Sequence, residues 1–146
     1  MINRLTKIFI VLTLASILST LHSAGSVNKS LSKDTAKVFI LSPKDKEIVE
    51  NPITVIFGVT DMEIVPAGVN KKYSGHHHLL IDVENLPELS KPIPSDKNHM
   101  HFGKGQTSTS INLMKGDHTL QLLMGDYIHI PHEIPIYSEK ITITVK

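Results

Sequence analysis

The 146-residue sequence contains no cysteine and no tryptophan, and only 5% of its residues are aromatic. Without thiols, the chain has no disulfide to hold its fold and no thiolate for catalysis or metal capture. Histidine, carboxylate and methionine therefore remain as the metal-binding side chains. The scarcity of aromatic residues argues against an aromatic platform for sugar binding.

An excess of charge of one sign is also lacking, since 15 basic residues face 14 acidic ones. No basic stripe is present that would follow a phosphate backbone, so we expect no nucleic-acid partner. The length fits one ordinary domain with a sizeable core and is too short for two.

Long apolar runs are rare, and the longest extends from Ile8 to Leu21. It is shorter than the roughly 20 residues that a membrane-spanning helix needs. Arg4 and Lys7 precede it and small residues follow at 23–26, a pattern typical of a secretory signal peptide. We expect a signal peptide over residues 1–25, a flexible polar linker over 26–37 and one domain over 38–146. The mature protein is expected to be periplasmic or secreted, with no membrane span.

Short segments of alternating apolar and polar residues dominate the rest of the chain. From Ile53 to Val59, apolar side chains recur at every second position, as in a half-buried strand. Further strands are expected over residues 38–41, 75–83, 108–113, 118–124 and 139–145. With no amphipathic helix, the pattern predicts an all-β antiparallel two-sheet sandwich, immunoglobulin-like in size, with a barrel as the alternative. The Lys115-Gly116-Asp117 step predicts a tight hairpin between 108–113 and 118–124.

Three consecutive histidines open the strand expected at Gly75–Val83, which reads GHHHLLIDV. Residues two apart in a strand lie on one face about 6.6 Å from each other, so His76 and His78 can bind the same ion. His77 points to the other face with the apolar side chains and is expected to be structural.

Two more histidine groups follow, and strand direction predicts that they approach the first. One lies in an irregular stretch at 84–107, and the other follows the strand at 118–124. If strand 75–83 runs antiparallel to 118–124, all three groups meet at one end of the sandwich. The candidate metal ligands are His76, His78, His99, His101, Asp126, His129 and His132. His118 falls at the opposite end, where a hydrogen bond is expected to satisfy it.

Four segments of the sequence together resemble a known family. They are Gly75–Asp82, His101–Thr107 (HFGKGQT), Gly116–Leu122 and His129–His132 (HIPH). The chain is similar in these segments to the domain of unknown function 4399 family of exported bacterial proteins. The resemblance implies export and a bacterial source, and it implies no established activity.

Three functions are compatible with these patterns. The first is a metal-binding module that holds copper or zinc, the ions that neutral imidazole suits best. The second is a non-catalytic interaction or adhesion domain of the cell envelope, whose histidines are structural and whose partner is an envelope protein. The third is a metal-dependent enzyme, which needs an open coordination position and a nearby acid or base. No nucleophile motif supports a metal-free enzyme, and the sequence favours binding over catalysis.

Overall fold

The computed structural model describes residues 28–146, so the signal peptide expected over 1–25 lies outside the described residues. The described part of the chain contains nine strands. They are β1 (Lys37–Ser42), β2 (Ile48–Val49), β3 (Ile53–Thr60), β4 (Glu63–Ile64), β5 (Ser74–Ile81), β6 (His99–His101), β7 (Ser108–Ile111), β8 (Gly116–Gly125) and β9 (Ile141–Val145). Within residues 28–146, no helix has the length and apolar character needed to cross a membrane.

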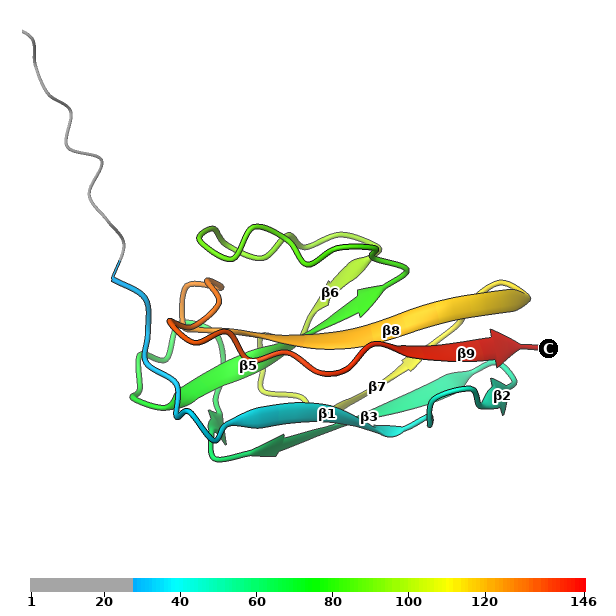
Figure 1. The fold of residues 1–146 in the computed structure, drawn as a ribbon, viewed down its shortest axis with the longest axis horizontal. Helices are drawn as coiled ribbons and strands as arrows, with labels where there is room; N and C mark the ends of the chain where they lie inside the picture. Colours follow the sequence, from blue (N-terminus) through cyan, green and yellow to red (C-terminus); the bar gives the residue numbers. More distant parts are fainter. Residues whose placement is uncertain (1–27) are drawn as a thin grey trace, which may run out of the picture.

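The strands form two layers, which confirms the predicted all-β two-sheet sandwich (Figure 1). The smaller sheet has the order β1-β3-β7 and is antiparallel throughout. The larger sheet has the order β2-β9-β8-β5-β4, and β6 also pairs with β5. Its long strands β5, β8 and β9 are antiparallel, while the short strands β2 and β4 are parallel to their neighbours.

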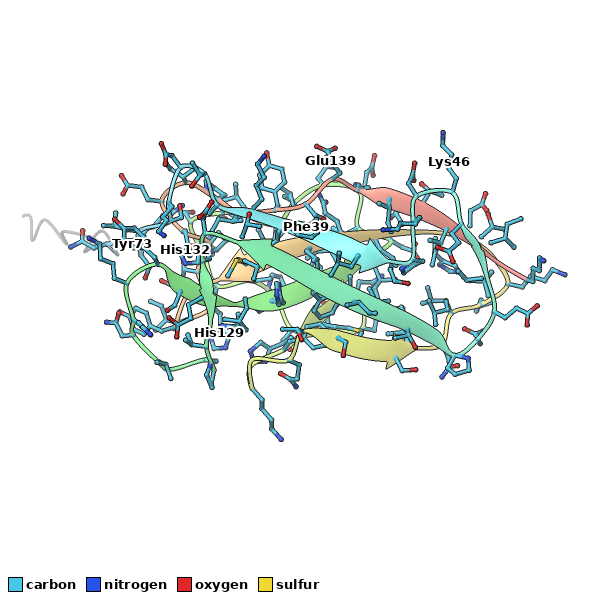
Figure 2. All side chains as sticks on the ribbon, turned by 90° about the horizontal axis from the view of Figure 1, so that it is seen from below. Phe39, Lys46, Tyr73, His129, His132 and Glu139 are labelled. Atoms are coloured by element: carbon cyan, nitrogen blue, oxygen red, sulfur yellow. The ribbon has the colours of Figure 1, made fainter. Side chains whose placement is uncertain are left out.

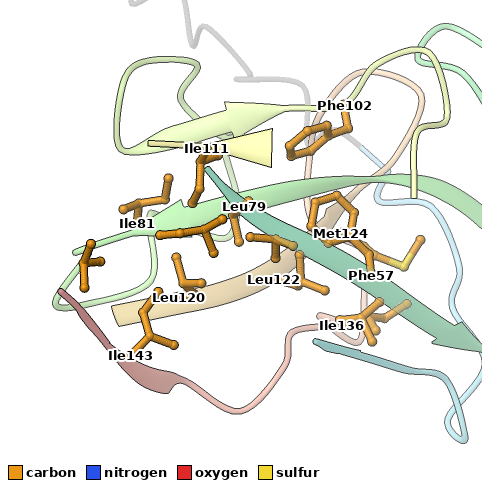
Figure 3. Close-up of a cluster of buried hydrophobic side chains, with 14 residues drawn as sticks. Phe57, Leu79, Ile81, Phe102, Ile111, Leu120, Leu122, Met124, Ile136 and Ile143 are labelled. Atoms are coloured by element: carbon orange, nitrogen blue, oxygen red, sulfur yellow. The ribbon is translucent and has the colours of Figure 1, made fainter. Parts of the chain in front are cut away.

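The core lies between the two sheets and follows the alternation seen in the sequence. In β3, Ile53, Val55 and Phe57 are buried, whereas Thr54 and Ile56 between them are exposed. Each buried aliphatic or aromatic side chain contributes about 1.5–3 kcal/mol through the hydrophobic effect. These side chains and those of β5, β7, β8 and β9 form one continuous cluster (Figure 3), which holds the domain without disulfides.

The hairpin predicted around Lys115-Gly116-Asp117 is wrong, because β7 and β8 belong to different sheets. Strand β7 pairs with β3, and residues 112–115 carry the chain across to the larger sheet. The physical reason for this arrangement is that β8 is buried on both of its faces. Residues 120–125 of β8 are all buried, which requires a central position. In that position β5 and β9 occupy both edges of β8 and leave none for β7.

Strand β5 is buried at every position from Ser74 to Ile81, although only one of its faces meets the core. The other face is covered from outside the sandwich by the stretch between β5 and β6, which Figure 1 draws in green on the side away from β1 and β3. Leu80, Leu123 and Ile93 form a second apolar cluster on this outer face. Polar side chains on the outer face of β5 are consequently buried as well.

Part of the polar stretch predicted as a flexible linker is hydrogen-bonded to the rest of the domain. Lys29 Nζ donates a hydrogen bond to Leu89 O at 2.6 Å, and Ser32 Oγ donates to Ile134 O at 2.8 Å. We call residues 28–36 the N-terminal segment. Its polar side chains bond to loops far away in the sequence, so these contacts cannot be predicted from an apolar pattern.

Candidate metal centre

Strands β5 and β6 bring three imidazole rings together on the outer face of the larger sheet. His76 and His78 project from the same face of β5, with ring centroids 4.9 Å apart. Strand β6 pairs antiparallel with β5 and places His101 directly beside His78, at 5.1 Å between ring centroids. One ring nitrogen from each of the three histidines lies within 4.8 Å of the others. The predicted antiparallel pairing of β5 with β8 is confirmed.

A fourth ring, that of His129, completes what we call the four-histidine cluster. Its centroid lies 4.8 Å from that of His101, 5.0 Å from His76 and 6.1 Å from His78. His129 comes from the loop that follows β8, and Figure 2 places it at the same end of the molecule as Tyr73. The cluster therefore joins two strands and one loop at a single point.

Hydrogen bonds to Asp126 shape the loop that carries His129. Asp126 Oδ1 accepts from the backbone N–H groups of Ile128 (3.0 Å) and Ile130 (2.9 Å), on either side of the histidine. The His129 N–H donates to Asp126 O at 2.9 Å, and His129 O accepts from Ile93 N–H at 2.8 Å. His129 itself has a φ of +70°, in the left-handed region that non-glycine residues rarely adopt. These bonds hold it there.

Two glycines let imidazole rings of the cluster lie directly against the backbone. A Cβ atom at Gly103 would lie 2.5 Å from Nε2 of His101, and one at Gly125 would lie 2.9 Å from Cε1 of His78. Neither separation is compatible with a side chain, so the ring positions depend on glycine at both places.

His76 and His78 are fully buried, and all four of their ring nitrogens lack a hydrogen-bond partner in the described protein. Burial, with smaller contributions from His101 and His129, lowers the pKa of His76 to about 4. Burial and the neighbouring histidines lower the pKa of His78 to about 2. Both rings are therefore neutral at pH 7, the form in which imidazole binds a metal ion.

His101 forms the side of the cluster that reaches solvent. It is exposed, while His129 beside it is half-buried. Partial burial and the nearby His129 also lower the pKa of His101. An ion would thus enter past His101 and meet the buried rings beneath it.

His77 lies on the opposite face of β5, as the alternation predicts. Its ring packs on Phe57 with centroids 5.2 Å apart, and burial lowers its pKa to about 4. Both of its ring nitrogens also lack a hydrogen-bond partner. Unpartnered nitrogens alone therefore do not define the site. What distinguishes the four-histidine cluster is that its rings converge.

The structure does not bring His132 into the cluster. Its Nε2 donates to Ser74 O at 2.9 Å, and its Cε1 would lie 2.9 Å from a Cβ on Gly75. Gly75 has the same orientation in β5 as His77, so His132 packs on the core side of the sheet. Burial lowers its pKa. The loop thus sends its two histidines, His129 and His132, to opposite faces.

Two other predicted ligands, His99 and Asp126, form hydrogen bonds outside the four-histidine cluster. His99 in β6 pairs with Leu80, whereas His101 pairs with His78, so His99 lies farther along β5 from His76. Its Nδ1 is 2.9 Å from Asp96 Oδ1. Asp126 is buried, with Oδ2 bonded to Ser30 Oγ and Oδ1 to the loop backbone. The carboxylate holds the loop together.

The remaining histidine, His118, lies toward the opposite end of β8 and is hydrogen-bonded, as predicted. Its Nδ1 is 2.7 Å from Asp82 Oδ2, and its Nε2 donates to Met114 O at 2.8 Å. Burial by itself lowers the pKa of His118, but the bonds to Asp82 and Met114 O together outweigh it, so the pKa is raised.

Sequence reasoning missed Gly103, Gly125 and Ser30 as parts of the site. Gly103 comes two residues after His101, and Gly125 pairs with His76 across β5 and β8; closeness in sequence to His101 was the available signal for Gly103. Ser30 is separated from Asp126 by 96 residues, and no local pattern connects them.

No match to the chain was found among curated proteins or among solved structures. One family model, described as "Domain of unknown function (DUF4399)", matches residues 55–146. The matched part is more than half of the chain and contains the whole four-histidine cluster, both glycines and Asp126. The chain belongs to the DUF4399 family, as its histidine and glycine motifs indicate.

Proposed function

We propose that the protein is a metal-binding module that holds one copper(II) or zinc ion in the four-histidine cluster. The observation that carries the proposal is the convergence of unpartnered, fully buried ring nitrogens of His76 and His78 with the ring of His101. Leaving buried polar atoms without partners costs free energy. A bound ion would offset this cost at one nitrogen of each of the two buried rings.

The spacing of the rings suits a transition metal ion. In a tetrahedral site with Zn–N bonds of about 2.0–2.1 Å, ligand nitrogens lie about 3.4 Å apart. The three nitrogens of His76, His78 and His101 lie within 4.8 Å of one another. Ring movements on the order of 1 Å would close the site on an ion with bonds of that length.

The donor set points to borderline ions. Imidazole suits zinc and copper(II), whereas thiolate and thioether ligands select copper(I) and carboxylates suit magnesium or calcium. Met100 alternates with His99 and His101 in β6 and packs against the core on the other face. Asp126 uses Oδ2 to accept from Ser30 in the N-terminal segment and Oδ1 to accept from the loop backbone. The cluster therefore offers nitrogen alone.

Binding fits this arrangement better than catalysis does. A catalytic zinc site keeps a coordination position open for water or substrate. Here four rings surround the space that an ion would take, with centroids 4.8–6.1 Å apart. Asp126, the acidic side chain whose charge acts on His76, is engaged in hydrogen bonds. We infer a carrier or structural metal site.

The alternative of an interaction domain with structural histidines expects each ring to be hydrogen-bonded. His99, His118 and His132 meet that expectation. His76 and His78 do not, and the alternative gives no reason for burying them side by side. The proposed site of action is the bacterial cell envelope, and this part of the proposal is based on the leader-like sequence pattern. An envelope protein is the proposed partner.

Calorimetric titration of the purified protein with Cu(II) and Zn(II) tests the proposal, with two variants of one strand compared. His101→Ala removes a cluster ring, whereas His99→Ala removes a histidine two residues away that is bonded to Asp96. We expect one ion per chain, loss of tight binding in His101→Ala and retention in His99→Ala. Binding no tighter than about 1 mM, roughly −4.1 kcal/mol, or equal binding by both variants, would contradict it.

A further inference from the structure

Ser30 in the N-terminal segment contacts the loop that carries His129 through its hydroxyl group and its backbone carbonyl. Ser30 Oγ donates to Asp126 Oδ2 at 2.7 Å, across 96 residues of sequence. The backbone of Ser30 also contacts the far end of the loop, where its carbonyl accepts from Glu133 N–H at 3.0 Å. The loop from Asp126 to Glu133 is thus held by the N-terminal segment at both of its ends.

Asp126 connects Ser30 to the backbone around His129. While Oδ2 bonds to Ser30, Oδ1 accepts from the N–H groups of Ile128 and Ile130. His129 lies between those two residues in a left-handed conformation. Such a conformation persists only where the surrounding structure holds it. The orientation of this carboxylate therefore acts together with the backbone bonds of the loop to fix the backbone from which the His129 ring projects.

His129 differs in this respect from the other three rings of the cluster. His76, His78 and His101 stand on strands whose ladder hydrogen bonds fix their positions. His129 stands on a loop, so its ring is the one whose place depends on contacts made elsewhere. A change in the attachment of the N-terminal segment would act on this ring first.

We propose that Ser30 is a positioning residue for the metal centre, a role that rests on the proposed function. By orienting Asp126, its hydroxyl holds His129 against the three strand-borne imidazoles. Loss of this hydroxyl would thereby reduce the number of imidazoles that hold the ion. Groups that bond to and orient metal-site residues in this way commonly change metal affinity 10–100-fold when removed.

The test compares three substitutions in the full-length protein. Ser30→Ala removes the hydroxyl, and Ser30→Thr keeps one. Ser32→Ala is the matched control in the same segment. In the described structure, Ser32 Oγ bonds to the backbone oxygen of Ile134 and not to Asp126. Cu(II) affinity is measured by titration, and the number of bound nitrogens by electron paramagnetic resonance. Thermal unfolding without metal shows whether Ser30→Ala and Ser32→Ala remain equally folded.

We expect Ser30→Ala to bind Cu(II) about tenfold more weakly and to show fewer bound nitrogens. Ser30→Thr and Ser32→Ala should match the wild type in both measurements. Equal affinity and spectrum for Ser30→Ala and Ser32→Ala would overturn the positioning role, as would failure of Ser30→Thr to restore them. If His101→Ala still loses the ion in that case, the metal site stands without it. Absence of binding by the wild type overturns both proposals.

Discussion

Glycine at positions 103 and 125 decides where two imidazoles of the four-histidine cluster lie. The glycines differ in what they face. Gly103 meets the exposed ring of His101, which has solvent on its other side, whereas Gly125 meets the fully buried ring of His78. A side chain at either position must displace a ring, but only the ring of His101 has somewhere to go.

Replacing Gly103 with alanine should therefore separate metal binding from stability. We expect the ring of His101 to swing into solvent, so that the melting temperature changes little while metal affinity falls tenfold or more. Gly125→Ala is the contrast, because His78 cannot move away and overpacking of this kind costs about 1–3 kcal/mol of stability. Thermal unfolding and metal titration measure both effects. Wild-type metal affinity in Gly103→Ala would contradict this account of His101.

At the same scale, the sequence predicts some side-chain positions well and others poorly. Alternation along a strand is enough to place His76 and His78 together and His77 on the core side. Loop residues follow no such rule. His129 and His132 form a pair in the sequence, yet their rings lie on opposite faces of the sheet because the backbone turns between them.

Among the elements, β5 concentrates three buried imidazoles in consecutive positions, and this gives the apo protein a marked response to acid. Histidine in an unfolded chain has a pKa near 6.5. In the folded chain the pKa is about 4 for His76 and His77 and about 2 for His78. Below pH 6.5 the unfolded state therefore binds more protons than the folded state, and folding loses stability as the pH falls.

We predict that the stability of the metal-free protein is full above pH 6.5 and decreases as the pH falls toward 4. A shift from 6.5 to about 4 at one histidine corresponds to a loss on the order of 3 kcal/mol. His118 has a raised pKa, so its contribution has the opposite sign, but it is one histidine against five whose pKa is lowered. Urea unfolding at pH 7, 6, 5 and 4 measures the trend. A midpoint that stays constant over this range would refute it.

The element scale also shows where pattern reasoning fails about the fold. Periodicity located most strands, including β3, β5, β8 and β9, because each buries alternate side chains or both faces. It did not assign β7 and β8 to separate sheets. A short Lys-Gly-Asp connection is compatible with a hairpin, and only the burial of β8 on both faces excludes it.

For the whole molecule, the two-sheet architecture explains how polar rings come to be buried. A sandwich has one core, and the outer faces of its sheets normally meet water. Here the stretch between β5 and β6 and the loop after β8 cover one outer face, so that His76 and His78 are fully buried while His101 remains exposed. The strands supply rigid positions for three rings, and the loop after β8 supplies the fourth.

This covering could be foreseen only in part. The stretch at 84–107 reads as irregular in the sequence and is long for a compact domain, a length typical of functional or disordered loops. That it folds over the outer face of β5 depends on apolar contacts of Ile93 with Leu80 and Leu123. The contact of the N-terminal segment with Asp126 depends on one hydroxyl. Such long-range polar contacts have no period in the sequence.

X-ray absorption spectroscopy of the zinc-loaded protein tests the central claim most directly, because it reports the atoms bound to the ion. We predict nitrogen neighbours at about 2.0–2.1 Å, with outer-shell scattering from three or four imidazole rings. The same measurement on the His76→Ala/His78→Ala variant should lose most of the imidazole signal, and His99→Ala should retain it. A shell made of oxygen alone, or a spectrum that the double variant leaves unchanged, would contradict the assignment of these histidines as metal ligands.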